Sequence, residues 1–138
     1  MWKPFDAVSN IYCTIIVDMD IKKFLKSFGY AFEGLKLALS VDQNVRIHMI
    51  VGLFVVTVSV IVQVTKMEFL FILFSIFFVL ITEMVNTSIE EMTNLIVKEH
   101  RMEAKIAKDV AAASVLLAAT FAVIVGIVIL IPRLIALF

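Results

Sequence analysis

The sequence has too little charge for a soluble domain of its length. Only 17% of its 138 residues are charged, whereas 62% are hydrophobic. Soluble domains have about 25% charged and about 45–50% apolar residues. Four glycines and two prolines exclude collagen-like and low-complexity classes, and the single cysteine allows no internal disulfide or cysteine-rich zinc site. We therefore expect an all-α integral membrane protein with few spans.

The sequence also lacks an excess of positive charge. Its 12 basic and 12 acidic residues cancel, so the electrostatic footprint of a nucleic-acid-binding protein is missing. We expect no nucleic-acid partner.

Three apolar segments predict three transmembrane helices, at about residues 47–65, 69–92 and 110–131. The middle segment is uncharged only from Phe69 to Thr82. Fourteen residues cover about 21 Å of a hydrocarbon core of about 30 Å. To cross the membrane, this helix must continue through Glu83 and Asn86. Ionisable residues at membrane depth are costly and are usually functional.

The segment before the first span has a different pattern. Over about residues 21–40, apolar side chains recur at helical spacing and lysines occupy the other side, which predicts an amphipathic helix on the membrane surface. An ordinary helix packed on the bundle fits the pattern equally well. We expect residues 1–20 to be an N-terminal extension, since they fit neither pattern, and residues 21–138 to form a single domain.

The positive charges predict the orientation in the membrane. They gather before the first span and in the second loop, whereas Lys66 is alone in the first loop. Because lysine and arginine are enriched in cytoplasmic loops, we expect the N-terminus and the second loop in the cytoplasm and the C-terminus outside.

A polar stripe continues from the middle span. On a helix, Asn86, Glu90 and Asn94 fall within about 60° of Glu83. Lipid cannot hydrogen-bond such a stripe, so it must face other helices or a water-filled cleft. One interpretation is a set of structural hydrogen bonds between helices; the other is a functional site.

Further charged residues lie at the entries to the other two spans. Asp42 and Arg46 precede the first, and Lys108 and Asp109 precede the last. Carboxylates, water and phosphate oxygens are the usual surroundings of Mg²⁺, and lysines neutralise phosphate charge. These residues favour phosphoryl transfer or cation handling at the membrane surface, although the second loop is also explained by the positive-inside rule.

At these residues the sequence resembles the prokaryotic diacylglycerol kinase family. The family pattern Glu-x-x-Asn-(Ser/Thr)-x-x-Glu is present at residues 83–90, and Ala-Lys-Asp follows at residues 107–109. The segment at residues 29–35 is similar to the family's surface-helix signature. Residues 44–48 are similar to the Arg-Ile-His form of the Gram-positive branch.

The resemblance implies a homotrimer in the bacterial inner membrane, with active sites shared between subunits and a phosphotransferase activity that uses ATP and Mg²⁺. Glu83 matches the catalytic base, and Asn86 an essential polar residue. The residues that match ATP-binding positions are Lys23, Tyr30, Asp42, Glu90, Glu99, Lys108 and Asp109. Asp42 and Glu90 also match the metal ligands. Glu83, Phe32 and Arg46 match the site of the lipid substrate.

The sequence departs from the family pattern at four places. Asp42 stands where the family usually has glutamate, and Lys23 where the enterobacterial form has arginine. Asn94 replaces a frequent aspartate. The loop has Glu99-His100-Arg101 instead of Glu-Tyr-His, so residues 100 and 101 do not match the family's nucleotide contacts.

We therefore predict a lipid kinase that phosphorylates a membrane alcohol. The Arg-Ile-His form favours undecaprenol, and diacylglycerol is the alternative. A small cation channel or a membrane assembly subunit is the alternative from another class. In that case the stripe would line a pore and the Lys108–Asp109 pair would remain unexplained.

Overall fold

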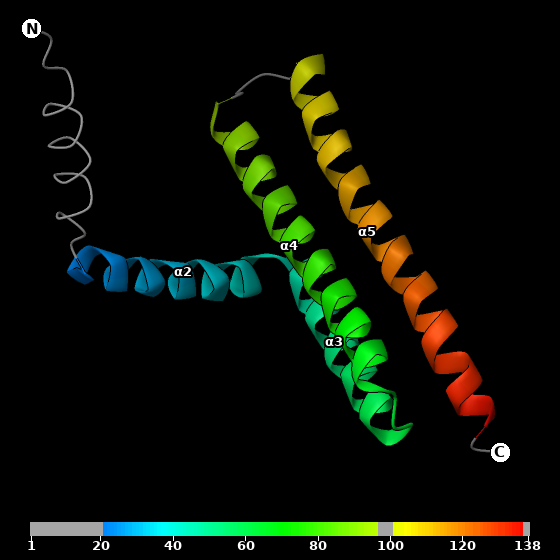
Figure 1. The fold of residues 1–138 in the computed structure, drawn as a ribbon. Coiled ribbons are helices and arrows are strands. Elements are labelled where there is room, and N and C mark those ends of the chain that lie inside the picture. The colour runs from blue at the N-terminus through cyan, green and yellow to red at the C-terminus, as the bar shows by residue number, and fades with distance from the viewer. Residues whose placement is uncertain (1–20, 97–100, 137–138) are drawn as a thin grey trace, which may run out of the picture. The chain divides into compact units, whose positions relative to one another are not determined.

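Four helices make up nearly all of the chain that the computed structural model describes, residues 21–96 and 101–136. They are α2 (Ile21–Val41), α3 (Gln43–Ile61), α4 (Lys66–Ile96) and α5 (Met102–Ile135), drawn in Figure 1. The two described ranges contain no strand. The predicted all-α class is confirmed, and the N-terminal extension at residues 1–20 lies outside the described residues.

Three of these helices, α3, α4 and α5, are long and apolar enough to cross a membrane. They have 19, 31 and 34 residues, which corresponds to about 28, 46 and 51 Å at a rise of 1.5 Å per residue. The number of helices that are able to span a membrane agrees with the prediction. Helix α4 runs without interruption past Thr82, so Glu83, Asn86 and Glu90 lie on the same helix as the apolar segment before them.

Helix α3 ends at Ile61, before the end of the predicted span at residue 65. The physical reason is Gln63, whose φ of +52° lies in the left-handed region and cannot continue a right-handed helix. The next helix is started by a capping box. The Thr65 N–H donates to Glu68 Oε2 over 2.7 Å, and the Glu68 N–H donates to Thr65 Oγ1 over 3.3 Å.

The chain divides into two compact units, which are described separately. The first extends to Leu37 and contains most of α2. Helix α2 has no buried residue, and the rings of Phe24 and Phe28 meet edge to face with centroids 5.2 Å apart. The second unit begins at Ala38 and contains the end of α2 together with α3, α4 and α5.

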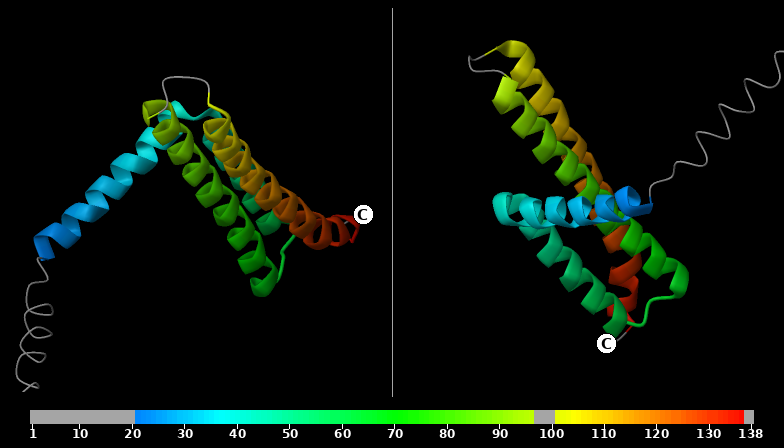
Figure 2. Two further views of the ribbon diagram at one scale, coloured as in Figure 1. Left: turned by 90° about the horizontal axis from the view of Figure 1, so that it is seen from above. Right: turned by 90° about the vertical axis from the view of Figure 1, so that its left-hand side faces the viewer.

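Within the second unit, α4 packs against both α3 and α5, as the views in Figures 1 and 2 show. Its buried positions follow one another at intervals of three and four residues, which places them on one helix face. They are Ile72, Ser75, Val79, Glu83 and Asn86. The same face that forms the apolar core therefore continues directly into the polar stripe.

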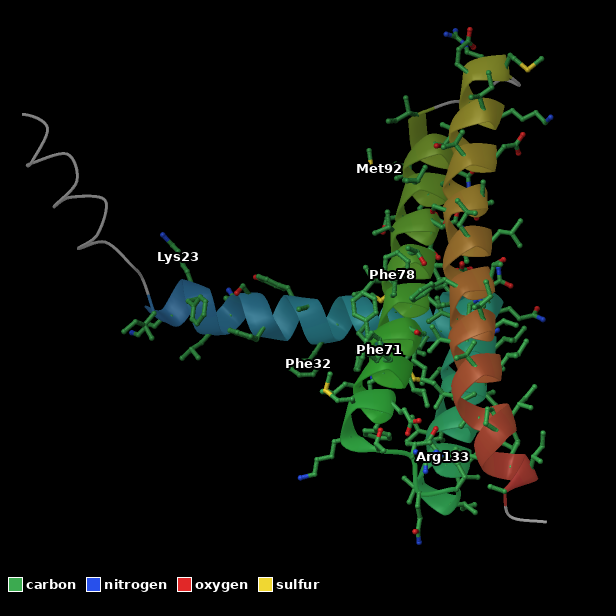
Figure 3. All side chains as sticks on the ribbon, turned by 45° about the vertical axis from the view of Figure 1, so that its right-hand side comes forward. Lys23, Phe32, Phe71, Phe78, Met92 and Arg133 are labelled. Carbon is green, nitrogen blue, oxygen red and sulfur yellow. The ribbon has the colours of Figure 1, made fainter. Side chains whose placement is uncertain are left out.

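Small residues let the three helices approach one another closely. The buried positions of α3 include Gly52 and Ser59, and those of α5 include Ala111 and Ala118. At the end of α5, Arg133 (Figure 3) pairs with Glu68 at 2.9 Å and so joins α5 to the first turn of α4. The outward faces expose many large apolar side chains, as expected for helices surrounded by lipid.

Candidate active site

Glu83 and Asn86 are buried polar residues in the core of the second unit. Glu83 is 1% exposed and Asn86 is 5% exposed. Glu83 Oε1 and Asn86 Oδ1 have no hydrogen-bond partner in the described part of the chain. Buried polar atoms without a partner cost about 1–3 kcal/mol each, and native structures contain few of them. These two oxygens are therefore the polar groups that most need a ligand.

The interpretation of this stripe as structural hydrogen bonds between helices predicts a partner for each of these oxygens on α3 or α5. Neither oxygen has one among the described residues. The amide of Asn86 instead stays within α4, where Nδ2 donates to Glu90 Oε1 over 3.3 Å. This bond orients both side chains along the stripe toward the end of α4.

Asp42 connects the start of α3 to the stripe. Its backbone has φ −95° and ψ 121°, and its carboxylate caps α3 by accepting the Asn44 N–H at Oδ1 over 2.7 Å. The other oxygen, Oδ2, accepts a hydrogen bond from the Thr87 hydroxyl of α4. Thr87 lies between Glu83 and Glu90 in sequence, so this bond brings the Asp42 carboxylate to the stretch of α4 that carries both glutamates.

Thr87 is a site residue that sequence reasoning did not single out. The helical projection places it on the polar side of α4, but hydroxyl side chains in helices usually bond only to the carbonyl one turn earlier. Thr87 Oγ1 also lies 3.0 Å from the Glu83 carbonyl oxygen. The distinguishing feature is the additional bond to Asp42, 45 positions away in the sequence, which no local spacing predicts.

The guanidinium of Arg46, a residue that matches the lipid site in sequence, contacts backbone carbonyls. Nη1 donates to the carbonyls of Leu39 and Ser40 over 3.2 and 2.9 Å. Cationic side chains stabilise the unpaired carbonyls at the C-terminal end of a helix. Arg46 therefore caps the last turn of α2 just before Asp42.

Lys108 joins the stripe from α5, whereas Asp109 does not. Lys108 Nζ donates to Asn94 Oδ1 of α4 over 2.6 Å, which places an ammonium group at the end of the stripe. Asp109 forms an exposed ion pair with Lys105 on its own helix at 3.5 Å. The structure thus brings one of these two predicted ATP-binding residues to α4.

The remaining predicted residues lie elsewhere. Glu99 is outside the described residues. Lys23, Tyr30 and Phe32 are on α2 in the first unit, where all three are exposed; Figure 3 labels Lys23 and Phe32. Lys26 Nζ lies 5.9 Å from the centroid of the Tyr30 ring on the same helix.

The residues of the second unit suit a hard cation with few protein ligands. The described ranges hold no group of three or more histidine, cysteine, aspartate or glutamate side chains placed to hold a metal. They do offer carboxylates at Asp42 and Glu90 and the unpaired amide oxygen of Asn86. Mg²⁺ is commonly bound by one or two carboxylates together with waters and substrate phosphates, and this oxygen-rich donor set fits that pattern.

An apolar cavity of about 400 Å³ lies among α3, α4 and α5. It is lined on α4 by Ile72, Ser75, Ile76 and Val79. Val79 lies one helical turn before Glu83 on the same face. The cavity and the buried carboxylate therefore occupy consecutive parts of one helix surface.

Comparison with known proteins identifies the family. The pattern of the prokaryotic diacylglycerol kinases matches residues 29–130. The chain is 40% identical to the diacylglycerol kinase of Synechocystis sp. over 114 residues, or 82% of this chain, and 30% identical to the undecaprenol kinase of Bacillus subtilis over 115 residues, or 83% of this chain. The chain belongs to the prokaryotic diacylglycerol kinase family, as predicted.

The two relatives are covered to different extents. The match spans 94% of the Bacillus protein and 65% of the Synechocystis protein, a little under two thirds of its length. Both relatives are named as kinases, in agreement with the enzyme class predicted from the sequence.

Proposed function

We propose that this protein is a lipid kinase that transfers the γ-phosphoryl group of ATP to the hydroxyl of a membrane alcohol. The observation that carries the proposal is the pair of buried, unpartnered oxygens on Glu83 and Asn86, next to the turn of α4 that Thr87 joins to Asp42. On α4, the apolar cavity ends at Val79, one turn before Glu83, and the Lys108 ammonium binds Asn94 near the other end of the stripe.

In this proposal Glu83 is the general base. Its burial keeps water away, so the unpaired Oε1 is available to accept the proton of a lipid hydroxyl. The hydroxyl oxygen then forms a bond to the γ-phosphorus as the bond between that phosphorus and the oxygen of ADP breaks. Catalysis of this reaction depends mainly on positioning and on neutralising charge.

Asp42 and Glu90 are the proposed ligands of Mg²⁺ carried by ATP. When bound, the ion neutralises charge on the phosphates and orients them. The protein contributes the fixed orientation of Asp42 and the Asn86–Glu90 hydrogen bond. Lys108 supplies positive charge next to the phosphates, and Lys23, Tyr30, Glu99 and Asp109 are proposed nucleotide contacts from elsewhere in the chain.

The apolar cavity is consistent with a substrate that remains in the membrane. Glu83 is 17 residues after the start of α4, or about 26 Å along the helix axis. This length places it near the far edge of a hydrocarbon core of about 30 Å. The hydroxyl of a lipid would reach this depth while its chain remains in apolar surroundings.

We further propose the arrangement in the membrane that the positive charges predict, in the bacterial inner membrane. The N-terminus and the loop between α4 and α5 lie in the cytoplasm, where ATP is available, and the C-terminus lies outside. Helix α2 lies on the membrane surface, because its exposed apolar side chains and its lysines need lipid and headgroups respectively. Three chains assemble into a homotrimer.

Undecaprenol is the proposed substrate. The Arg46-Ile47-His48 sequence, which is similar to that of the undecaprenol kinases of the family, supports it. Diacylglycerol is the second candidate, because the identity to the Synechocystis diacylglycerol kinase is 40%, against 30% to the Bacillus undecaprenol kinase.

A substrate panel tests the proposal. The purified full-length protein in bilayer nanodiscs is given radiolabelled ATP, Mg²⁺ and either undecaprenol or diacylglycerol, and the lipid fraction is counted. We expect a higher kcat/KM for undecaprenol. A higher value for diacylglycerol would replace the substrate, and no labelled lipid with either alcohol would contradict the proposed function.

A further inference from the structure

Two residues on different helices, Thr87 and Arg46, hold Asp42 and the backbone before it. Thr87 on α4 donates its hydroxyl to Oδ2 of the Asp42 carboxylate. Arg46 on α3 holds the carbonyls of Leu39 and Ser40, which belong to the backbone immediately before Asp42. The side chain and the backbone of Asp42 are thus fixed from different helices.

The Thr87 hydroxyl has one hydrogen and two acceptors in reach, Asp42 Oδ2 and the Glu83 carbonyl oxygen. A hydrogen bond to an ionised carboxylate is roughly twice as strong as one to a neutral acceptor. The hydrogen therefore goes mainly to Asp42. A valine at position 87 would keep the shape of the side chain and remove this bond.

The Asp42 carboxylate keeps capacity for a metal in this arrangement. An ionised carboxylate has about four lone-pair positions. Asn44 N–H takes one at Oδ1 and Thr87 takes one at Oδ2, so each oxygen retains a free lone pair. The two bonds decide where those lone pairs point.

We propose that Thr87 and Arg46 are positioning residues that aim Asp42 at the metal carried by ATP. This inference rests on the proposed function, because it takes Asp42 as a ligand of that metal. It differs from the role predicted for Arg46 from the sequence, which was contact with the lipid. The two roles predict different kinetic effects, since a positioning residue acts on Mg·ATP and a lipid contact acts on the alcohol.

The first test compares three variants of the full-length protein: Thr87→Val, Thr87→Ser and Thr93→Val. Thr93 is the matched control, because its hydroxyl donates to the Ile89 carbonyl of its own helix over 2.7 Å. Binding of Mn²⁺ in place of Mg²⁺ is measured by electron paramagnetic resonance with a non-hydrolysable ATP analogue present. Steady-state KM values for ATP and for undecaprenol are measured in parallel.

We expect Thr87→Val to weaken Mn²⁺ binding and to raise the KM for ATP about fivefold, the effect of one lost hydrogen bond, with the KM for undecaprenol unchanged. Thr87→Ser restores the hydroxyl and should restore Mn²⁺ binding. Thr93→Val should bind Mn²⁺ as the wild type does. The proposal would be overturned if Thr87→Val bound Mn²⁺ as tightly as the wild type does. It would also be overturned if the wild type bound no Mn²⁺.

The second test uses Arg46→Met and Arg46→Lys. We expect Arg46→Met to raise the KM for ATP and to speed hydrogen–deuterium exchange of the amides at residues 39–45, with a smaller effect of Arg46→Lys. A raised KM for undecaprenol alone would return Arg46 to the lipid site. Because the Mn²⁺ and exchange measurements need no turnover, they test the positioning role even if no alcohol is phosphorylated and the proposed function fails.

Discussion

At the scale of single residues, the burial of Glu83 lowers the stability of the fold. It is 1% exposed and its Oε1 has no partner among the described residues. Burying a carboxyl group without a full set of hydrogen bonds is unfavourable, and an apolar side chain of similar size is not. Residues of this kind persist where the site needs them, so stability and activity should respond in opposite directions to their replacement.

The first prediction concerns the stability of Glu83→Met. We expect the free energy of unfolding of this variant to be about 1–3 kcal/mol higher than that of the wild type. We also expect the variant to lose phosphoryl transfer. The measurement is equilibrium unfolding in mixed micelles, followed by circular dichroism. Glu91→Met, at an exposed position of the same helix, is the control and should leave stability within about 0.5 kcal/mol. If Glu83→Met and the wild type had equal free energies of unfolding, the buried Glu83 carboxyl group would not destabilise the fold, which would contradict the prediction.

The residues of the site were predictable from the sequence to different degrees. Glu83, Asn86 and Glu90 stand out because polar side chains at helical spacing interrupt an apolar segment. The sequence gives no comparable sign for the Thr87–Asp42 bond or for the bonds of Arg46 to Leu39 and Ser40. Those bonds depend on how α3 meets α4 and on how the chain turns at Asp42, which are properties of tertiary packing.

At the scale of helices, the close approach of α3 and α4 depends on a glycine. A Cβ atom at position 52 would lie 2.8 Å from Ile76 Cγ2, which is shorter than any normal contact between carbon atoms. Position 126 on α5 has no atom within 4 Å of the equivalent Cβ position. The two glycines therefore have different roles, although both line the apolar cavity.

The second prediction compares Gly52→Ala with Gly126→Ala. We expect Gly52→Ala to lower the free energy of unfolding by about 1–3 kcal/mol, because α3 or Ile76 must move. Gly126→Ala should be neutral or slightly stabilising, since alanine favours helix more than glycine does. Unfolding in mixed micelles gives both values.

The double variant Gly52→Ala/Ile76→Ala provides the check on mechanism. Alanine at position 76 removes Cγ2, the atom that the new Cβ would overlap, so the two changes should be non-additive. Strict additivity would mean that the cost of Gly52→Ala comes from elsewhere.

The approximate positions of the helices could be predicted from the apolar composition of their segments. Their first and last residues were less predictable. The apolar segments indicate α3, α4 and α5, but the span expected at about 47–65 lies on a helix of bounds Gln43–Ile61. Its start is set by the Asp42 cap and its end by the left-handed Gln63. Neither feature has the periodicity that identifies a helix, and both are local backbone conformations.

At the scale of the whole molecule, few of the described residues are buried. Within the described ranges, the buried hydrophobic core consists of seven residues, from Val45 on α3 to Ala118 on α5. The membrane accounts for exposed apolar side chains, but it cannot satisfy the unpaired oxygens of the stripe. Substrate and neighbouring subunits are the groups that can do so in the proposed trimer.

The third prediction concerns this assembly. We expect native mass spectrometry in detergent to give a mass of three chains of 15.5 kDa each, without a monomer peak under conditions that preserve activity. In mixed assemblies, chains carrying Lys23→Gln and chains carrying Glu83→Gln should recover part of the activity that each variant lacks alone. Full activity of an isolated monomer would show that one chain forms the complete site.

The central claim is that buried Glu83 accepts the proton of a lipid alcohol during phosphoryl transfer from ATP. The most direct measurement compares the wild type with Glu83→Gln in nanodiscs, using radiolabelled ATP, Mg²⁺ and undecaprenol, with folding verified by circular dichroism. Glutamine preserves the shape of the side chain and cannot accept the proton, so we predict that kcat falls by about 10²-fold or more while the fold is retained. Unchanged transfer of label by folded Glu83→Gln would contradict the account.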